Sequence, residues 1–158
     1  MMEFSCEMNR RGFLLASYSV VAVVLSPGLR AADTPDPWSK KELMEPPELA
    51  TLLKNQHALP VIYCVAFPVL YRGKHIPHAI FAGPASKAEG ITDLRMAVGS
   101  LPKVTAIVVY CGCCPMKNCP NIRPAYRTLK ELGFDTVRVL DLPTNFHKDW
   151  VLKGYPVV

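Results

Sequence analysis

Residues 104–132 read VTAIVVYCGCCPMKNCPNIRPAYRTLKEL. The first seven are β-branched or apolar, which is typical of a buried strand, and a helical pattern follows Pro124 and ends before Gly133. The loop between them contains four cysteines: Cys111, Cys113, Cys114 and Cys119. The sequence therefore predicts a strand, a cysteine loop and a helix in direct succession.

Apolar runs of strand length and helical patterns alternate through the rest of the chain. Strands are expected at 61–67, within 71–84, at 104–110 and at 136–140, and helices at 38–44, 48–55, 92–98, 125–132 and 146–153. This alternation predicts an α/β fold, in which one parallel sheet is covered by helices on both faces. A chain of 158 residues has room for a single such domain. Because ligands bind at the carboxyl ends of parallel strands, the cysteine loop lies where a site is expected.

Cys111 stands where the central strand ends and is the first candidate for a reactive thiol. The N–H groups at the start of a following helix would stabilise its thiolate and lower its pKa. Gly112 suits a backbone curled around a small anion, and Lys117 and Arg123 would add positive charge. A structural role for the four cysteines, as disulfides or metal ligands, is an equally open interpretation.

The N-terminus has the pattern of an export signal. Residues 9–15 read NRRGFLL, an uncharged run extends to residue 25, and Ala31 and Ala32 are small. The paired arginines resemble a twin-arginine signal. We expect a signal peptide over residues 1–31, a flexible leader over 32–37 and a domain over 38–158, with a periplasmic or otherwise exported location. A signal that stays uncleaved and anchors the chain is the alternative; once it is cleaved, no stable membrane span is expected.

Export affects how the cysteines and the charges are interpreted. Five cysteines would remain after cleavage, an odd number, so at least one thiol should stay unpaired in the monomer. Cys64 lies inside an apolar run and is expected to be a buried packing residue. The net charge of +5 is scattered rather than gathered into a basic stripe, which argues against nucleic acid and mildly favours small anions.

Residues 75–79, HIPHA, are similar to the GHIPGA segment of rhodanese-like domains, with His78 in place of glycine. The strand ending at Cys111, the helix closing in 132–134, the strand TVRVL and the ending DWVLKGYPVV also follow the order of that family. The chain resembles the family over about residues 38–158, and the CGCCP…CPNIRPAY loop resembles an exported subgroup. Trp150 resembles the family's C-terminal core tryptophan.

The resemblance implies a sulfurtransferase that needs no cofactor. The matching cysteine, Cys111, would carry a persulfide and move sulfane sulfur from a thiosulfate-like donor to a thiol or other thiophilic acceptor. Three features depart from the family. Met116 and Lys117 stand where its loop usually ends in arginine, Cys64 and Ala66 stand where an Asp-x-Arg segment is usual, and the extra cysteines are unusual. Arg123, at the start of the helix, is the candidate for orienting an anionic substrate.

Two other functions remain open. Cys111 and Cys114 form a C-x-x-C that would serve a thiol–disulfide redox protein with a periplasmic redox partner. Cys114, Cys119 and Cys113 are also candidates for resolving a persulfide on Cys111. In the second alternative the four loop cysteines hold zinc or an iron–sulfur centre in a non-catalytic module.

Overall fold

The structure, a computed structural model, describes residues 35–56 and 58–158. The expected signal peptide and the first part of the leader lie outside these residues. Within the described part, no helix is long and apolar enough to cross a membrane.

Five parallel strands form one sheet in the order β1-β5-β4-β2-β3. The strands are β1 (Leu43–Met44), β2 (Val61–Cys64), β3 (Ile80–Phe81), β4 (Ile107–Tyr110) and β5 (Val137–Leu140). The expected parallel sheet is thus confirmed. Strand β4 is central, and Tyr110, its last residue, is paired with Cys64 at the end of β2. The two strands therefore end at the same level, immediately before Cys111.

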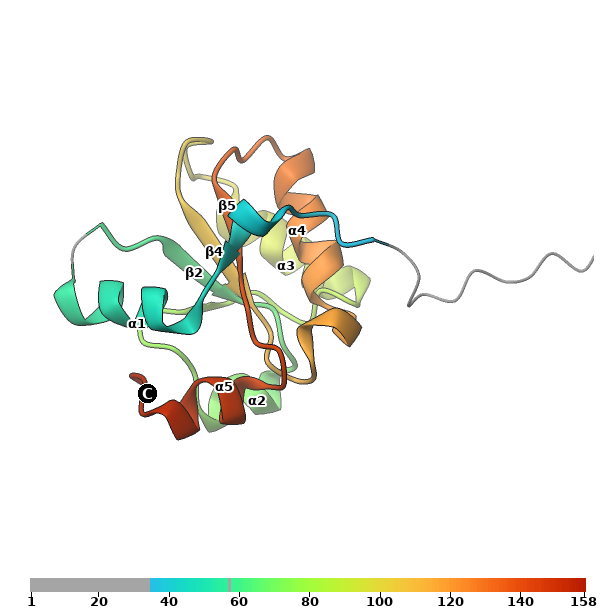
Figure 1. The fold of residues 1–158 in the computed structure, drawn as a ribbon. Helices are drawn as coiled ribbons and strands as arrows, with labels where there is room; N and C mark the ends of the chain where they lie inside the picture. Colours follow the sequence, from blue (N-terminus) through green and yellow to red (C-terminus); the bar gives the residue numbers. More distant parts are fainter. Residues whose placement is uncertain (1–34, 57) are drawn as a thin grey trace, which may run out of the picture.

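Helices cover both faces of this sheet, as predicted. They are α1 (Pro46–Asn55), α2 (Pro68–Gly73), α3 (Ala88–Val98), α4 (Ile122–Glu131) and α5 (Phe146–Asp149), with 3₁₀ turns η2 (Lys40–Glu42), η3 (Met116–Asn118) and η4 (Val151–Lys153). In Figure 1, α3 and α4 lie together on one side of the sheet and α1 lies on the other. The short helices α2 and α5 lie close together at the bottom of this view.

Several predicted boundaries were wrong, because tertiary contacts decided them. The helix expected over 38–44 is the turn η2 followed by strand β1, since Leu43 pairs with Val139 at the edge of the sheet. Helix α2 was not predicted, because a six-residue helix has too few turns to show a period. Helix α4 begins at Ile122, before Pro124, because a proline in the first turn removes no hydrogen bond that the helix needs.

The core confirms the role expected for Trp150, which is completely buried and donates its Nε1–H to the Pro156 carbonyl at 2.8 Å. The end of the chain is held to the HIPHA segment, where His75 and Val158 exchange two backbone hydrogen bonds of 3.0 Å. His78, which replaces the family's glycine, adopts a left-handed φ of 64°. The C-terminal segment and the HIPHA segment therefore close the same end of the fold.

Candidate active site

Cys111 follows the last residue of β4 and is 3% exposed. The next residue, Gly112, has a φ of +75°, a conformation that side chains disfavour. This turn brings Cys113 back towards Cys111. The loop conformation thus depends on a glycine between the two cysteines.

Cys113 is the centre of a cluster of four sulfur atoms. Its Sγ lies 3.2 Å from that of Cys111, 3.1 Å from that of Cys114 and 3.9 Å from that of Cys119. All four residues are free thiols. The C-x-x-C motif had suggested Cys114 as the neighbour of Cys111, but the sulfur atoms grouped with that of Cys111 are those of Cys113, at 3.2 Å, and Cys119.

Asn121 is a polar residue of the site that the sequence analysis missed. It is completely buried, and its Oδ1 accepts a hydrogen bond of 2.9 Å from the Ser86 backbone N–H. That bond requires the amide nitrogen Nδ2 to point the other way, where it donates to the Cys111 sulfur at 3.3 Å. The signal for it was weak, because an asparagine beside a helix start is usually interpreted as a cap.

The pKa values of the buried thiols differ from the expectation. Hydrogen bonds donated to Cys113 and Cys119, together with burial, raise the pKa of the Cys111 thiol, whereas a lowered value had been predicted. The helix N-terminus lowers the pKa of Cys119 instead of that of Cys111. The pKa of Cys119 is lowered by the hydrogen bond from Cys111 and by backbone N–H groups of Asn121 and Ile122, where α4 begins.

Within the cluster, hydrogen bonds favour the charged form of Cys113. Hydrogen bonds from Cys111 and Cys114 lower the pKa of this half-buried thiol to about 5, even though burial opposes the effect. Burial and the hydrogen bond to Cys113 raise the pKa of Cys114 to about 12. At neutral pH the resting site therefore pairs a Cys113 thiolate with a Cys111 thiol.

Alkylation at controlled pH tests this assignment. Because the thiolate is the nucleophile, iodoacetamide at pH 6 should modify Cys113 before Cys111 and Cys114, and the rate should fall as the pH drops through about 5. Peptide mass spectrometry after brief labelling measures this order. Replacing Cys111 with alanine removes a donor and should move the midpoint to higher pH. A Cys113 rate that rises only above pH 8 would contradict the assignment.

Arg123 contacts the backbone of the cysteine loop rather than the sulfur atoms of the cluster. The Arg123 guanidinium donates to the carbonyls of Lys117 and Cys119, at 2.8 and 3.4 Å, and pairs with Asp36. It also lies 5.7 Å from the centre of the Trp38 ring. Arg123 thus braces the far side of the cysteine loop, and neither it nor the exposed Lys117 lines the cavity described next.

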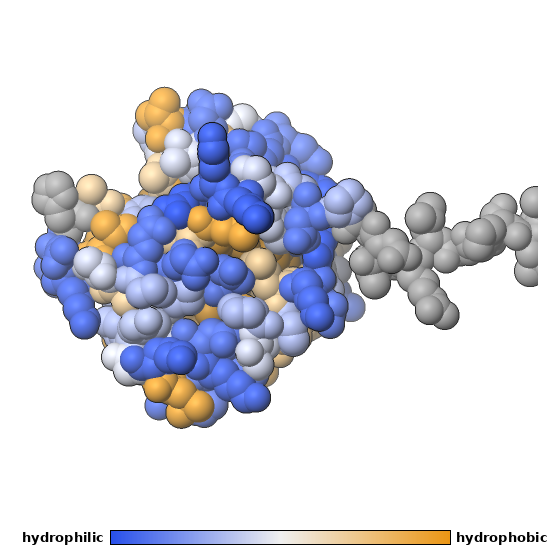
Figure 2. Space-filling model, viewed as in Figure 1, coloured by the Kyte–Doolittle hydropathy of each residue, from blue (hydrophilic) through white to orange (hydrophobic). Residues whose placement is uncertain are grey.

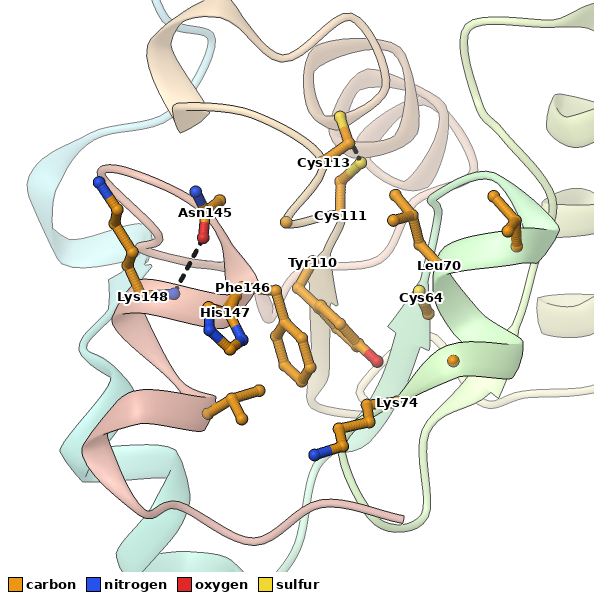
Figure 3. A pocket seen from close by; sticks show the side chains of 14 residues that line it. Cys64, Leu70, Lys74, Tyr110, Cys111, Cys113, Asn145, Phe146, His147 and Lys148 are labelled. Carbon is orange, nitrogen blue, oxygen red and sulfur yellow. Dashed lines mark hydrogen bonds between the residues drawn. The ribbon is translucent and has the colours of Figure 1, made fainter.

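A cavity of about 430 Å³ opens beside Cys111 and Cys113. It is lined from β2, α2, the end of β4, α5 and η4 by Cys64, Val69, Leu70, Gly73, Lys74, Tyr110, Cys111, Gly112, Cys113, Asn145, Phe146, His147, Lys148 and Val151. Figure 3 shows the two cysteines at one end, Tyr110 and Phe146 in the middle and Lys74 at the other end. The cations at this cavity are therefore Lys74, which follows α2, and Lys148, which is in α5. The periodicity of the sequence gives no sign that these two segments lie near Cys111.

The expected packing role of Cys64 agrees with its burial, which raises its pKa. Its neighbour Tyr110 is also buried, and the Tyr110 hydroxyl accepts a hydrogen bond of 3.2 Å from the Ile76 backbone N–H. The HIPHA segment is thereby joined to the wall of the cavity. The face in Figure 2 is largely hydrophilic, with separate hydrophobic spots rather than one continuous patch.

The cysteine cluster has the geometry of three possible metal ligands rather than four. The Sγ atoms of Cys111, Cys113 and Cys119 lie within 4.8 Å of one another, and Cys114 is not in this group. Thiolates suit soft ions. Among the described residues, three of the four loop thiols are thus grouped as possible ligands of one ion.

Comparison with known proteins adds evidence about the fold. No family model matches the chain, and a search of curated proteins finds no match. Solved structures do match. A rhodanese-like domain from Anabaena sp. is 23% identical, with a TM-score of 0.54 over 74% of this chain and 78% of its own. The fold is rhodanese-like.

Two further structures with this fold have similar scores. Another structure of the Anabaena protein is 22% identical, with a TM-score of 0.57 over 73% of this chain and 81% of its own. A protein from Bacillus halodurans is 23% identical, with a TM-score of 0.57 over 73% of this chain and 74% of its own. The rhodanese-like fold predicted from the HIPHA segment and the order of elements is thus confirmed, and the fold places Cys111 at the carboxyl end of the central strand.

Proposed function

We propose that this protein is a sulfurtransferase in which Cys111 carries sulfane sulfur as a persulfide. The observation that carries the proposal is the pair of sulfur atoms 3.2 Å apart at the end of β4, beside a cavity that reaches Lys74. A rhodanese-like fold supports a sulfurtransferase-type domain without specifying the reaction.

The first step uses Cys113 as the base for Cys111. As the Cys111 sulfur attacks the outer sulfur of thiosulfate, its proton passes to the Cys113 thiolate, and the S–S bond of thiosulfate breaks to release sulfite. One proton is transferred, and the total charge is unchanged. The products are a Cys111 persulfide anion, a Cys113 thiol and sulfite.

The lining of the cavity suits an anionic donor. Lys74 and Lys148 supply positive charge, and none of the described residues that line the cavity is a carboxylate. The amide Nδ2 of Asn121, which already donates to the Cys111 sulfur, would stabilise negative charge on that atom. These groups take the place that the sequence analysis gave to Lys117 and Arg123.

Mass spectrometry of the anaerobic protein before and after thiosulfate tests the proposal. We expect variant Cys113→Ser to release one sulfite per chain and to gain one sulfur atom on its Cys111 peptide. This variant needs a long incubation, because the base that accepts the Cys111 proton is missing. Variant Cys111→Ser should gain no sulfur. Protein that releases no sulfite in any of these forms, even with excess thiosulfate, would disprove sulfur transfer through this site.

The thiol–disulfide function remains the second candidate, and the observed distances change its cysteine pair. The Cys111–Cys113 separation of 3.2 Å favours that pair over Cys111–Cys114. A redox titration with non-reducing peptide maps would distinguish the two pairs.

We further propose that residues 1–31 direct export, so that the domain works in the periplasm with a small sulfur-containing anion, a thiol acceptor and a dithiol redox partner. The support is the sequence NRRGFLL before an apolar run. Fractionation of cells that express the full chain tests this location. Replacing both Arg10 and Arg11 with lysine should keep the protein in the cytoplasm.

A further inference from the structure

The inference concerns what happens to the sulfur after Cys111 has received it, and it rests on the proposed function. We propose that Cys113 resolves the Cys111 persulfide within the same chain, so that the protein releases hydrosulfide and is left with a Cys111–Cys113 disulfide. An external acceptor of sulfane sulfur is then not needed. A dithiol reductant returns the disulfide to two thiols in a separate step.

Distance is the main argument. The Cys113 sulfur lies 3.2 Å from the Cys111 sulfur, within the range of about 3–3.5 Å that characterises atoms poised to react. A disulfide requires these atoms to approach to about 2.05 Å. The two residues are separated only by Gly112, whose left-handed φ already turns their side chains towards each other, as the sulfur contact in Figure 3 shows.

The step balances without any further reactant. The Cys113 sulfur bonds to the inner sulfur of the persulfide, the S–S bond of the persulfide breaks, and the outer sulfur leaves with the electron pair of that bond. The proton that Cys113 took from Cys111 leaves with it as hydrosulfide. Over the loading and resolving steps together, two thiol sulfurs are oxidised to a disulfide, and one sulfane sulfur is reduced to sulfide.

Burial determines which sulfur of the persulfide is attacked. Attack on the outer sulfur would expel the Cys111 thiolate, whose pKa is raised by its hydrogen bonds and its burial, and a more basic thiolate leaves more slowly. Attack on the inner sulfur expels hydrosulfide, which can leave through the cavity. The inner attack is therefore favoured.

The other two cysteines of the loop are worse placed for this step. Cys114 contacts Cys113 at 3.1 Å, and its sulfur lies outside the group formed by the sulfurs of Cys111, Cys113 and Cys119, which are within 4.8 Å of one another. Cys119 accepts a hydrogen bond from Cys111, but it is 2% exposed, does not line the cavity and is held by backbone hydrogen bonds from the start of α4. The geometry assigns resolution to Cys113, which the sequence analysis had named only as one of three candidates.

A single-turnover experiment on the full chain tests the assignment. Reduced protein, freed of reductant and kept anaerobic, receives one equivalent of thiosulfate, and sulfite, sulfide and peptide masses are followed over time. Wild type should release one sulfide per sulfite and acquire a Cys111–Cys113 linkage. Variant Cys113→Ser is loaded to completion with thiosulfate and desalted. It should then hold its extra sulfur on Cys111 and release sulfide at least about a hundredfold more slowly than wild type.

Cys114→Ser is the matched control, because it changes the neighbouring residue and should slow release by no more than about fivefold, the value of one lost hydrogen bond. Three outcomes would overturn the assignment: a stable persulfide in wild type, sulfane sulfur found on Cys113 without sulfide release, or a linkage to Cys114 or Cys119. The wild-type linkage can be mapped even if a variant misfolds. Absence of both sulfite and persulfide in every form would instead refute the sulfur-transfer function itself.

Discussion

Replacing Cys111 with serine should reduce thiosulfate cleavage by at least about 10³-fold, the scale on which losing a nucleophile acts. A serine oxygen at this position cannot form a persulfide, and the Cys113 thiolate would lose its sulfur partner. The fold should survive, because serine has nearly the same shape and the Asn121 amide can still donate to its oxygen. Initial rates of sulfite release, with thermal unfolding of the same samples, measure both effects.

Variant Cys114→Ser distinguishes this result from a redox function built on the C-x-x-C motif. Sulfur transfer through Cys111 and Cys113 predicts that the variant keeps most of its activity, whereas a Cys111–Cys114 couple predicts a loss similar to that of Cys111→Ser. If Cys111→Ser still gains one sulfur atom, and that atom is on Cys113, then the more exposed thiolate is the nucleophile and the assignment of Cys111 is wrong.

Replacing Gly112 with alanine is expected to produce the second large effect, on stability and activity together. A Cβ at this position would lie 2.4 Å from the Phe146 Cβ and 3.2 Å from its Cα and N. The Gly112 carbonyl also accepts a hydrogen bond of 3.1 Å from the Phe146 N–H, so the loop and α5 are in direct contact there. Either α5 or the cysteine loop must move, and Cys111 and Cys113 would separate.

The expected loss of stability combines two terms. The left-handed φ of +75° costs about 1–2 kcal/mol for a residue with a side chain, and overpacking adds about 1–3 kcal/mol. Variant Gly133→Ala is the matched control, because Gly133 has a φ of +84° but a Cβ there would meet nothing within 4 Å. Gly133→Ala should lose only the stability that the left-handed φ costs, without the overpacking term. Urea unfolding of the two variants and the wild type measures the difference.

Sulfite release at a temperature where all three proteins are folded completes the comparison. Gly112→Ala should lose most of its activity, and Gly133→Ala should keep it, because the latter lies beyond the end of α4, away from the cavity. Equal stability losses in the two variants would show that α5 accommodates the methyl group, and the close contact with Phe146 would then not restrain the loop.

The order of secondary-structure elements and the position of Cys111 were predictable because they depend on local patterns. The apolar run predicted as a strand over 104–110 forms β4 from Ile107 to Tyr110, where all four residues are buried as in a parallel strand covered on both faces, and a cysteine follows that strand directly. The position of Gly133 at the end of α4 was predictable for a similar reason, since its φ of +84° suits glycine.

The chemical relations within the site depended on contacts between distant segments. Strand β1 exists because β5 offers it hydrogen bonds, and Arg123 was lost as a candidate because Asp36 and two loop carbonyls engage it. The cations at the cavity are Lys74, immediately after α2, and Lys148 in α5, and these two segments meet only in the folded chain.

The sequence by itself determined the parallel fold and which cysteine ends the central strand, because burial and periodicity act over a few neighbouring residues. Only the tertiary structure decided which thiol faces Cys111 and which one is ionised. Spacing in the C-x-x-C motif pointed to Cys114, but the turn at Gly112, packed against Phe146, brings Cys113 to 3.2 Å instead. A sulfur–sulfur distance and a thiol pKa depend on backbone turns and burial, which are set by packing between elements far apart in the chain.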